Sequence, residues 1–173
     1  MTTQSRLFGI LFMFASASAA FGASALRETA NGPDTADSVL NVGGAILSSG
    51  GSALPGADVG ISVRIADRSP LYAGAELGTF FSLGNASYGV FPILGSLYYQ
   101  FEPVSALHPL LGAMAGPVFS TGGGVSAGRL AVLFRPGFNI ELGRRAAINI
   151  EPRFGVIGSS FVFIPQAGAI FAI

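Results

Sequence analysis

The sequence contains no cysteine, no lysine and no tryptophan, and it is poor in charged residues of either sign. Without cysteine the chain can form neither a disulfide nor a thiolate metal site, and its single histidine provides no cluster of metal ligands. Nine arginines balance nine acidic residues, so the chain lacks the basic surface that nucleic-acid binding requires. We therefore expect no metal, no cofactor and no nucleic-acid partner.

Charged residues make up 10% of the chain, against about 25% in ordinary soluble domains, which is too few to cover a water-facing surface. A membrane-spanning helix, however, needs about 20 consecutive apolar residues. Beyond Ser38, glycine, proline, asparagine or aspartate interrupts the apolar runs. Even the least charged stretch, 103–128, contains Pro109, Pro117 and three consecutive glycines, which break helices. The composition thus favours a membrane protein that is not helical.

The first residues have the pattern of a secretory signal. Arg6 supplies a positive charge, residues 7–14 form a short apolar run, and small residues follow. A single N-terminal membrane anchor is the alternative, but the apolar run is shorter than the about 20 residues that a spanning helix needs. We expect residues 1–25 to be a cleaved signal peptide, residues 26–37 a flexible periplasmic leader, and residues 38–173 the folded domain.

Apolar and polar residues alternate with period two on both sides of a turn at 143–146. Before the turn, the polar residues all have odd numbers and the intervening positions are apolar; the polar set is Arg129, Arg135, Asn139 and Glu141. After the turn, the polar positions are Asn149, Glu151 and Arg153. Because successive side chains of a strand point to opposite faces, each segment is predicted to be a strand with one apolar and one charged face.

Weaker alternation of the same kind extends this interpretation to the rest of the domain. It predicts eight strands, at 39–48, 57–66, 71–83, 88–101, 109–120, 126–142, 147–158 and 161–173. Most of them are longer than the about 9–11 residues that a tilted strand needs to cross a membrane, and an even number is typical of single-chain bacterial barrels. The predicted fold class is all-β: a closed, antiparallel, eight-stranded, up-and-down transmembrane β-barrel.

A barrel of alternating strands can face its charges outward, as a soluble ligand-binding barrel does, or inward, as a membrane barrel does. An arginine at the lipid midplane costs about 2–4 kcal/mol, so we predict that the charges pair inside. Eight strands leave just enough interior room for side chains, and the lumen is therefore expected to be polar and plugged. The predicted lumen network consists of Arg64, Glu76, Arg129, Arg135, Glu141, Glu151 and Arg153.

Aromatic residues near the strand ends are expected to form two girdles at the membrane interfaces. The periplasmic girdle is predicted to contain Tyr98, Tyr99, Phe101 and Phe171. The outer girdle is predicted to contain Phe80, Phe81, Tyr88, Phe119, Phe161 and Phe163.

Prolines lie inside several of the predicted strands, where each removes a ladder hydrogen bond. Pro136 and Pro152 lie nearly opposite each other across the turn at 143–146. We therefore predict a local irregularity of the sheet between them.

The last eight residues carry the most specific motif. Gln166, Gly168, Phe171 and Ile173 occupy the polar, glycine, aromatic and final apolar places of a pattern that resembles the C-terminal assembly signal of bacterial outer-membrane barrels, although the usual last residue is phenylalanine. Over residues 38–173 the chain resembles the small eight-stranded barrels of the OmpA transmembrane domain and OmpX. This resemblance implies residence in the bacterial outer membrane, insertion by its assembly machinery, and contact with its lipids and lipopolysaccharide. We expect a monomer.

Four functions remain open for such a chain. A structural or interaction barrel without catalytic activity is favoured over a narrow channel for small solutes, a lipid A-modifying enzyme and a soluble secreted ligand-binding barrel. An enzyme would use His108 as the base for a serine nucleophile, but this histidine lies in a predicted periplasmic turn and no His-x-Ser motif is present. Glu76, Glu141 and Glu151 are better explained by salt bridges than by acid–base catalysis, so no catalytic residue is expected.

Overall fold

The computed structural model describes residues 37–66, 69–82, 88–122, 125–143 and 145–173. The signal peptide predicted at 1–25, and all but the last residue of the leader predicted at 26–37, lie outside these ranges. The eight strands are β1 (Ser38–Ser49), β2 (Ser52–Arg64), β3 (Leu71–Phe81), β4 (Tyr88–Gln100), β5 (Leu107–Gly122), β6 (Val125–Gly143), β7 (Ala146–Ile157) and β8 (Ser160–Ala172). Over the described ranges, no helix has the length and apolar character to cross a membrane.

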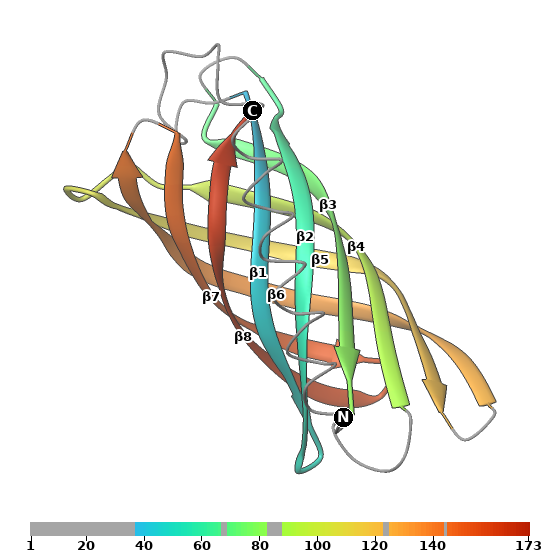
Figure 1. Cartoon of the computed structure of the whole chain (residues 1–173). Helices are drawn as coiled ribbons and strands as arrows, with labels where there is room; N and C mark the ends of the chain where they lie inside the picture. Colours follow the sequence, from blue (N-terminus) through green and yellow to red (C-terminus); the bar gives the residue numbers. More distant parts are fainter. Residues whose placement is uncertain (1–36, 67–68, 83–87, 123–124, 144) are drawn as a thin grey trace.

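The strands form one closed barrel, in which each strand pairs with its neighbours in the sequence and β1 pairs with β8. All neighbouring strands are antiparallel. Figure 1 shows the C-terminus beside the start of β1, where the N–H of Ile173 donates to the carbonyl oxygen of Ser38 at 3.0 Å. We call this end of the barrel the C-terminal end and the opposite end the distal end. The predicted fold class is confirmed.

The connection between β1 and β2 is tighter than the sequence suggested. A loop was predicted at 49–56, but β2 begins at Ser52 and the turn consists of Gly50 and Gly51, with φ of 54° and 84°. A type I′ hairpin turn, whose twist matches that of the strands, requires positive φ at both positions, which glycine adopts without steric cost. The predicted loop is therefore wrong, because the paired ladder continues to the last residue of β1.

Some of the strand prolines coincide with gaps in the hydrogen-bonded ladder. Between β6 and β7, pairing stops after Phe134 and resumes at Phe138 in the same register. That register places Pro136 opposite Pro152, and neither residue has an N–H to donate. The predicted irregularity at these two prolines is confirmed, and a separate register shift lies beside the turn that joins the two strands.

The outer face of the wall is apolar on every strand. In the described strands, all charged residues have the opposite, lumen-facing parity. The exposed apolar residues include Ile46, Ile61, Leu77, Ile93, Leu111, Val132, Val156 and Phe163. The distribution is therefore the inverse of that in a soluble protein, with apolar side chains outside and charged ones inside.

Two aromatic residues were assigned to the wrong face. Phe80 and Tyr98 were expected in the interfacial girdles, but they are 2% and 5% exposed and point into the lumen. Strand alternation explains this, because each has the same parity as a lumen-facing neighbour, Glu76 on β3 and Gln100 on β4. Exposed aromatics do lie near the strand ends, among them Phe81, Tyr88, Tyr99, Phe101, Phe119, Phe161 and Phe163.

Candidate functional site: the charged network of the lumen

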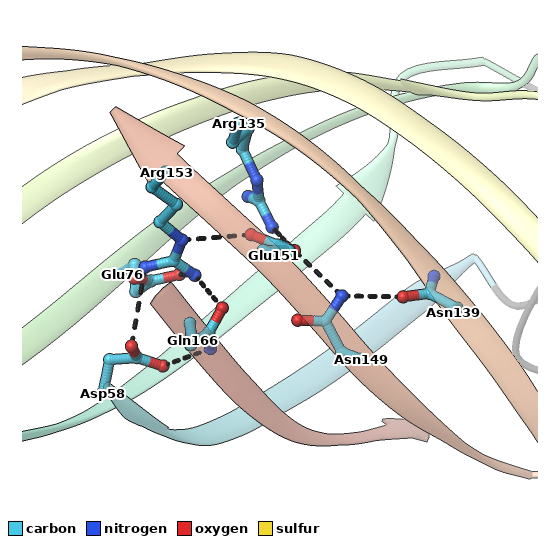
Figure 2. Close-up of polar contacts among 8 residues, drawn as sticks. All are labelled: Asp58, Glu76, Arg135, Asn139, Asn149, Glu151, Arg153 and Gln166. Atoms are coloured by element: carbon cyan, nitrogen blue, oxygen red, sulfur yellow. Dashed lines mark hydrogen bonds and ion pairs between the residues drawn. The ribbon is translucent and has the colours of Figure 1, made fainter. Parts of the chain in front are cut away.

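The lumen is layered along the barrel axis, and its central layer is charged. Asp58 on β2, Glu76 on β3, Arg135 on β6, and Glu151 and Arg153 on β7 all point inward, and none is more than 6% exposed. Figure 2 shows these side chains converging with neighbouring amide groups in the middle of the barrel. These three carboxylates and two guanidinium groups, together with the side-chain amide of Gln166 on β8, form one buried network, which we call the central network.

Arg153 is the hub of the central network. Its guanidinium donates to both carboxylate oxygens of Glu76, with the Nη2–Oε2 distance at 3.0 Å. Its Nε donates to Oε2 of Glu151 at 3.0 Å, and its Nη2 donates to Oε1 of Gln166 at 2.6 Å. Its Nη1 also lies 3.5 Å from Oδ2 of Asp58. The planar fork of arginine suits such multiple contacts, so one side chain of β7 ties together groups from β2, β3 and β8.

Glu151 is the most enclosed carboxylate, with 0% exposure. Its Oε1 accepts hydrogen bonds from Arg135 and from Nδ2 of Asn149, the latter at 2.9 Å. The same amide nitrogen of Asn149 donates to Oδ1 of Asn139 at 2.8 Å. Together with Arg153, these donors offset the cost of removing a carboxylate from water, which is several kcal/mol when the charge is unpaired.

Gln166 connects two strands that are not neighbours. Its Nε2 donates to Oδ1 of Asp58 at 2.7 Å, although β1 lies between β8 and β2. The contact passes over Gly43 of β1, where an added Cβ would collide with the Gln166 amide and lie 3.1 Å from Asp58. Glycine at position 43 therefore leaves the space through which β8 reaches β2.

Toward the C-terminal end, the central network continues as a column in which two stacked tyrosine rings lie between two arginines. Arg135 lies over the ring of Tyr98, with 4.8 Å between the guanidinium carbon and the ring centroid. Tyr98 stacks on Tyr72 at 5.1 Å, and the hydroxyl of Tyr72 accepts a hydrogen bond from Arg64 at 2.9 Å. Cation–π contacts in desolvated surroundings contribute about 2 kcal/mol or more, so the tyrosines help to hold the two arginines in the lumen.

The distal layer of the lumen is apolar. Its buried side chains form one cluster with members from all eight strands: Ala45, Leu47, Leu54, Phe80, Val90, Leu94, Met114, Val118, Ala131, Leu133, Ile157, Val162 and Ile164. Two small cavities flank the central network, and each has room for about one water molecule. The expectation of a polar lumen therefore applies to the central layer and is wrong for the distal layer. It applies in part toward the C-terminal end, where Val39, Ile170 and Ala172 form a small apolar cluster.

The structure brings together four of the seven residues predicted for the lumen network: Glu76, Arg135, Glu151 and Arg153. Arg64 joins them through the tyrosine column. Glu141 lies near the C-terminal end, where its Oε2 is 3.7 Å from Nε2 of His108. His108 had been interpreted as a turn residue, but it is the second residue of β5 and is 2% exposed.

Arg129 lies outside the central network. It has the predicted lumen-facing parity but is exposed, because β7 ends at Ile157, opposite Ala131. At the height of Arg129, the wall on the β7 side has already ended. The alternation predicted which way this side chain points but not its height along the barrel.

Sequence reasoning missed two members of the central network. Asp58 shares the even parity of Arg64 on the same strand, so the alternation contained the signal that would have identified it. Gln166 was assigned to the assembly signal and not to the lumen network. Its partnership with Asp58, 108 residues away in the chain, has no local signature in the sequence.

Known proteins resemble this chain in structure but not measurably in sequence. No family model and no curated protein sequence matches it. Neisserial surface protein A superposes with a TM-score of 0.62 at 14% identity, covering 79% of this chain and 96% of that one. The N-terminal barrel domain of Pseudomonas aeruginosa OprF gives 0.56 at 10% identity, covering 79% and 97%. The Yersinia pestis outer membrane protein Ail in a nanodisc gives 0.51 at 12% identity, covering 79% and 98%.

These identities are low, so the likeness establishes the fold. The chain is a closed, eight-stranded barrel of the transmembrane type, with an apolar outer wall and a charged interior. Its fold is that of the small bacterial outer-membrane proteins.

Proposed function

We propose that this protein is an integral barrel of the bacterial outer membrane with a structural role and a lumen closed to solutes. The proposal rests on the distribution of side chains over the two faces of the sheet. The outer face is apolar, and every charged residue of the described strands has lumen-facing parity. An arginine turned to the lipid midplane would cost about 2–4 kcal/mol, and closure of the sheet lets the backbone groups pair as hydrocarbon demands. The outer-membrane proteins that share the fold support the same compartment.

Two barriers in series support a closed lumen. A solute would have to displace Arg153 from partners on four strands and then pass an apolar layer that contains Met114 and Leu133, which are 1% and 2% exposed. Apolar constrictions oppose ion passage because ions lose their hydration there. A narrow channel would require both barriers to move.

The described distal turns favour a structural role over recognition of an external partner. Gly50–Gly51 and Gly158–Ser159 present only glycine and serine. Binding hot spots are enriched in tryptophan, tyrosine and arginine, and none of these occurs in the two turns. The 2% exposure of His108 likewise disfavours catalysis, because a substrate would not reach its ring without movement of the wall.

Conductance of the folded protein tests this proposal. The chain would be extracted from the outer-membrane fraction, its folded state checked by heat-modifiable gel mobility, and the barrel reconstituted in planar bilayers. We expect no steady single-channel current. A steady current would show that the protein is a narrow channel and not a closed barrel. Recovery of the protein in the soluble periplasmic fraction would overturn the membrane assignment.

A further inference from the structure

Three outward-facing prolines are each next to a member of the central network in the sequence. The segments are Arg135–Pro136, Glu151–Pro152–Arg153 and Pro165–Gln166. Because successive residues of a strand face opposite sides, each proline lies on the outer wall while its neighbour points into the lumen at the same height. The backbone defects and the side-chain network therefore occupy the same level of the barrel.

The first defect is the seam between β6 and β7. Pro136 and Pro152 are opposite each other, so the two backbone hydrogen bonds of this pair cannot form. In these two described strands, the pairing is interrupted between Phe134 and Phe138. At this level, a hydrogen bond from Arg135 on β6 to Glu151 on β7 joins the same two strands inside the lumen. A side-chain bond thus spans the seam where the backbone bonds are missing.

The second defect is the seam between β8 and β1. Pairing stops at Gln166 opposite Ala45 and resumes three residues along β1. The register places Pro165 opposite Ile46, and the proline cannot donate to it. The Gln166–Asp58 hydrogen bond of 2.7 Å crosses β1 beside this gap. Between the two defects, the β7–β8 ladder is unbroken from Ala146 to Ile157.

Other ladder gaps differ from the one between β6 and β7. Pro92 interrupts the β3–β4 ladder and Pro117 interrupts the β4–β5 ladder. In each of those pairs only one strand contributes a proline, so the partner residue still has an N–H. Pro152 also lies opposite Pro165 in the β7–β8 pair, but that ladder continues without a gap. Among the described strands, β6–β7 is therefore the one seam where facing prolines coincide with a gap in the pairing.

We propose that the central network acts as a latch on the β7–β8 hairpin. The side-chain bonds of Glu151, Arg153 and Gln166 hold this hairpin at two seams that its prolines have weakened. When the latch is released, the β6–β7 seam opens first, because it has lost two backbone bonds whereas the β8–β1 seam has lost one. Such an opening would expose the charged lumen sideways to the lipid, a motion that a barrel with fully paired seams resists.

Amide hydrogen exchange of the folded barrel in lipid vesicles tests the latch. Glu151→Gln keeps the shape of the side chain but removes the charge that Arg135 and Arg153 bind. We expect exchange at the β6–β7 seam to become about tenfold faster or more, as the loss of charge-assisted hydrogen bonds implies. Exchange along the unbroken β5–β6 ladder should not change.

The decisive experiment restores the missing backbone hydrogen-bond donors. Combining Glu151→Gln with Pro136→Val and Pro152→Val returns two N–H groups to the seam, and exchange there should return toward the wild-type rate. Glu141→Gln, on β6 but outside the central network, is the matched control and should leave every seam unchanged. If Glu151→Gln does not fold, Gln166→Leu tests the β8–β1 seam, with Pro165→Val as its rescue. Equal acceleration at all seams, or no rescue by valine, would overturn the latch.

Discussion

At the scale of single residues, the barrel depends on how a few charges are satisfied away from water. Arg153 is 2% exposed and binds Glu76, Glu151 and Gln166. A buried ion pair of this kind is weak evidence for net stability, but removing one partner is costly because the remaining charge stays buried. The same reasoning separates Arg153 from Arg129, which is exposed and has no part in the central network.

Arg153→Met is therefore expected to lower the free energy of unfolding by about 3–5 kcal/mol. Methionine keeps much of the side-chain volume but leaves Glu76 and Glu151 without their shared donor. Urea unfolding in lipid vesicles, followed by heat-modifiable gel mobility, measures this change. The matched variant Arg129→Met should stay within about 0.5 kcal/mol of wild type. Equal losses in both variants would contradict the assigned roles.

At the scale of the strand, alternation sets the face, and prolines set where the ladder weakens. The last strand shows how one segment can satisfy several demands. Gln166 binds Asp58 and Arg153, and an added Cβ at Gly168 would lie 2.5 Å from the carbonyl oxygen of Val42. The contacts inside the barrel thus explain why position 166 is glutamine and position 168 is glycine. Their role in an assembly signal, with Phe171 and Ile173, remains a prediction.

Leu77→Arg tests the facing of β3. Leu77 is 53% exposed on the outer wall, next to the lumen-facing Glu76. A charge there would meet hydrocarbon at a cost of about 2–4 kcal/mol, so the fraction of folded barrel in the membrane should fall. Ser52→Arg, beside the distal turn, provides the same charge outside the wall and should fold normally. Equal folded fractions on a heat-modifiable gel would show that the outer wall is not in lipid.

At the scale of the whole molecule, closure of the sheet creates a lumen with layers of different chemistry. The central network joins groups from β2, β3, β6, β7 and β8, and the apolar layer lies on its distal side. Neither layer can be recognised from one strand, because no strand contributes more than two inward residues to either layer. The two layers act in series, and removal of one leaves the other in place.

Folded Arg153→Met barrels are accordingly expected to remain without steady current in planar bilayers, because the distal layer still blocks the lumen. A variant that also carries Met114→Ser and Leu133→Ser removes apolar groups from that layer and should pass small ions. Current through Arg153→Met alone would show that the central network is the only barrier. The absence of current in the combined variant would place the block elsewhere.

Much of the fold follows from period-two alternation, which is a local property. It predicted eight strands, their order and the face of nearly every charged residue. It failed at Gly50–Gly51, where glycine allowed a turn shorter than the polar stretch suggested. It also failed to determine height, so Arg129 was placed in a network that it does not reach, while Asp58 was overlooked despite its parity.

By itself, the sequence determined the class of environment and the inward or outward direction of each side chain, because successive residues of a strand must face opposite sides and lipid penalises charge. Only the tertiary structure decided which inward groups meet. Gln166 and Asp58, or Arg153 and Glu76, come together through register and closure, which depend on pairing across the whole barrel. The division of the lumen into charged and apolar layers is a consequence of that pairing.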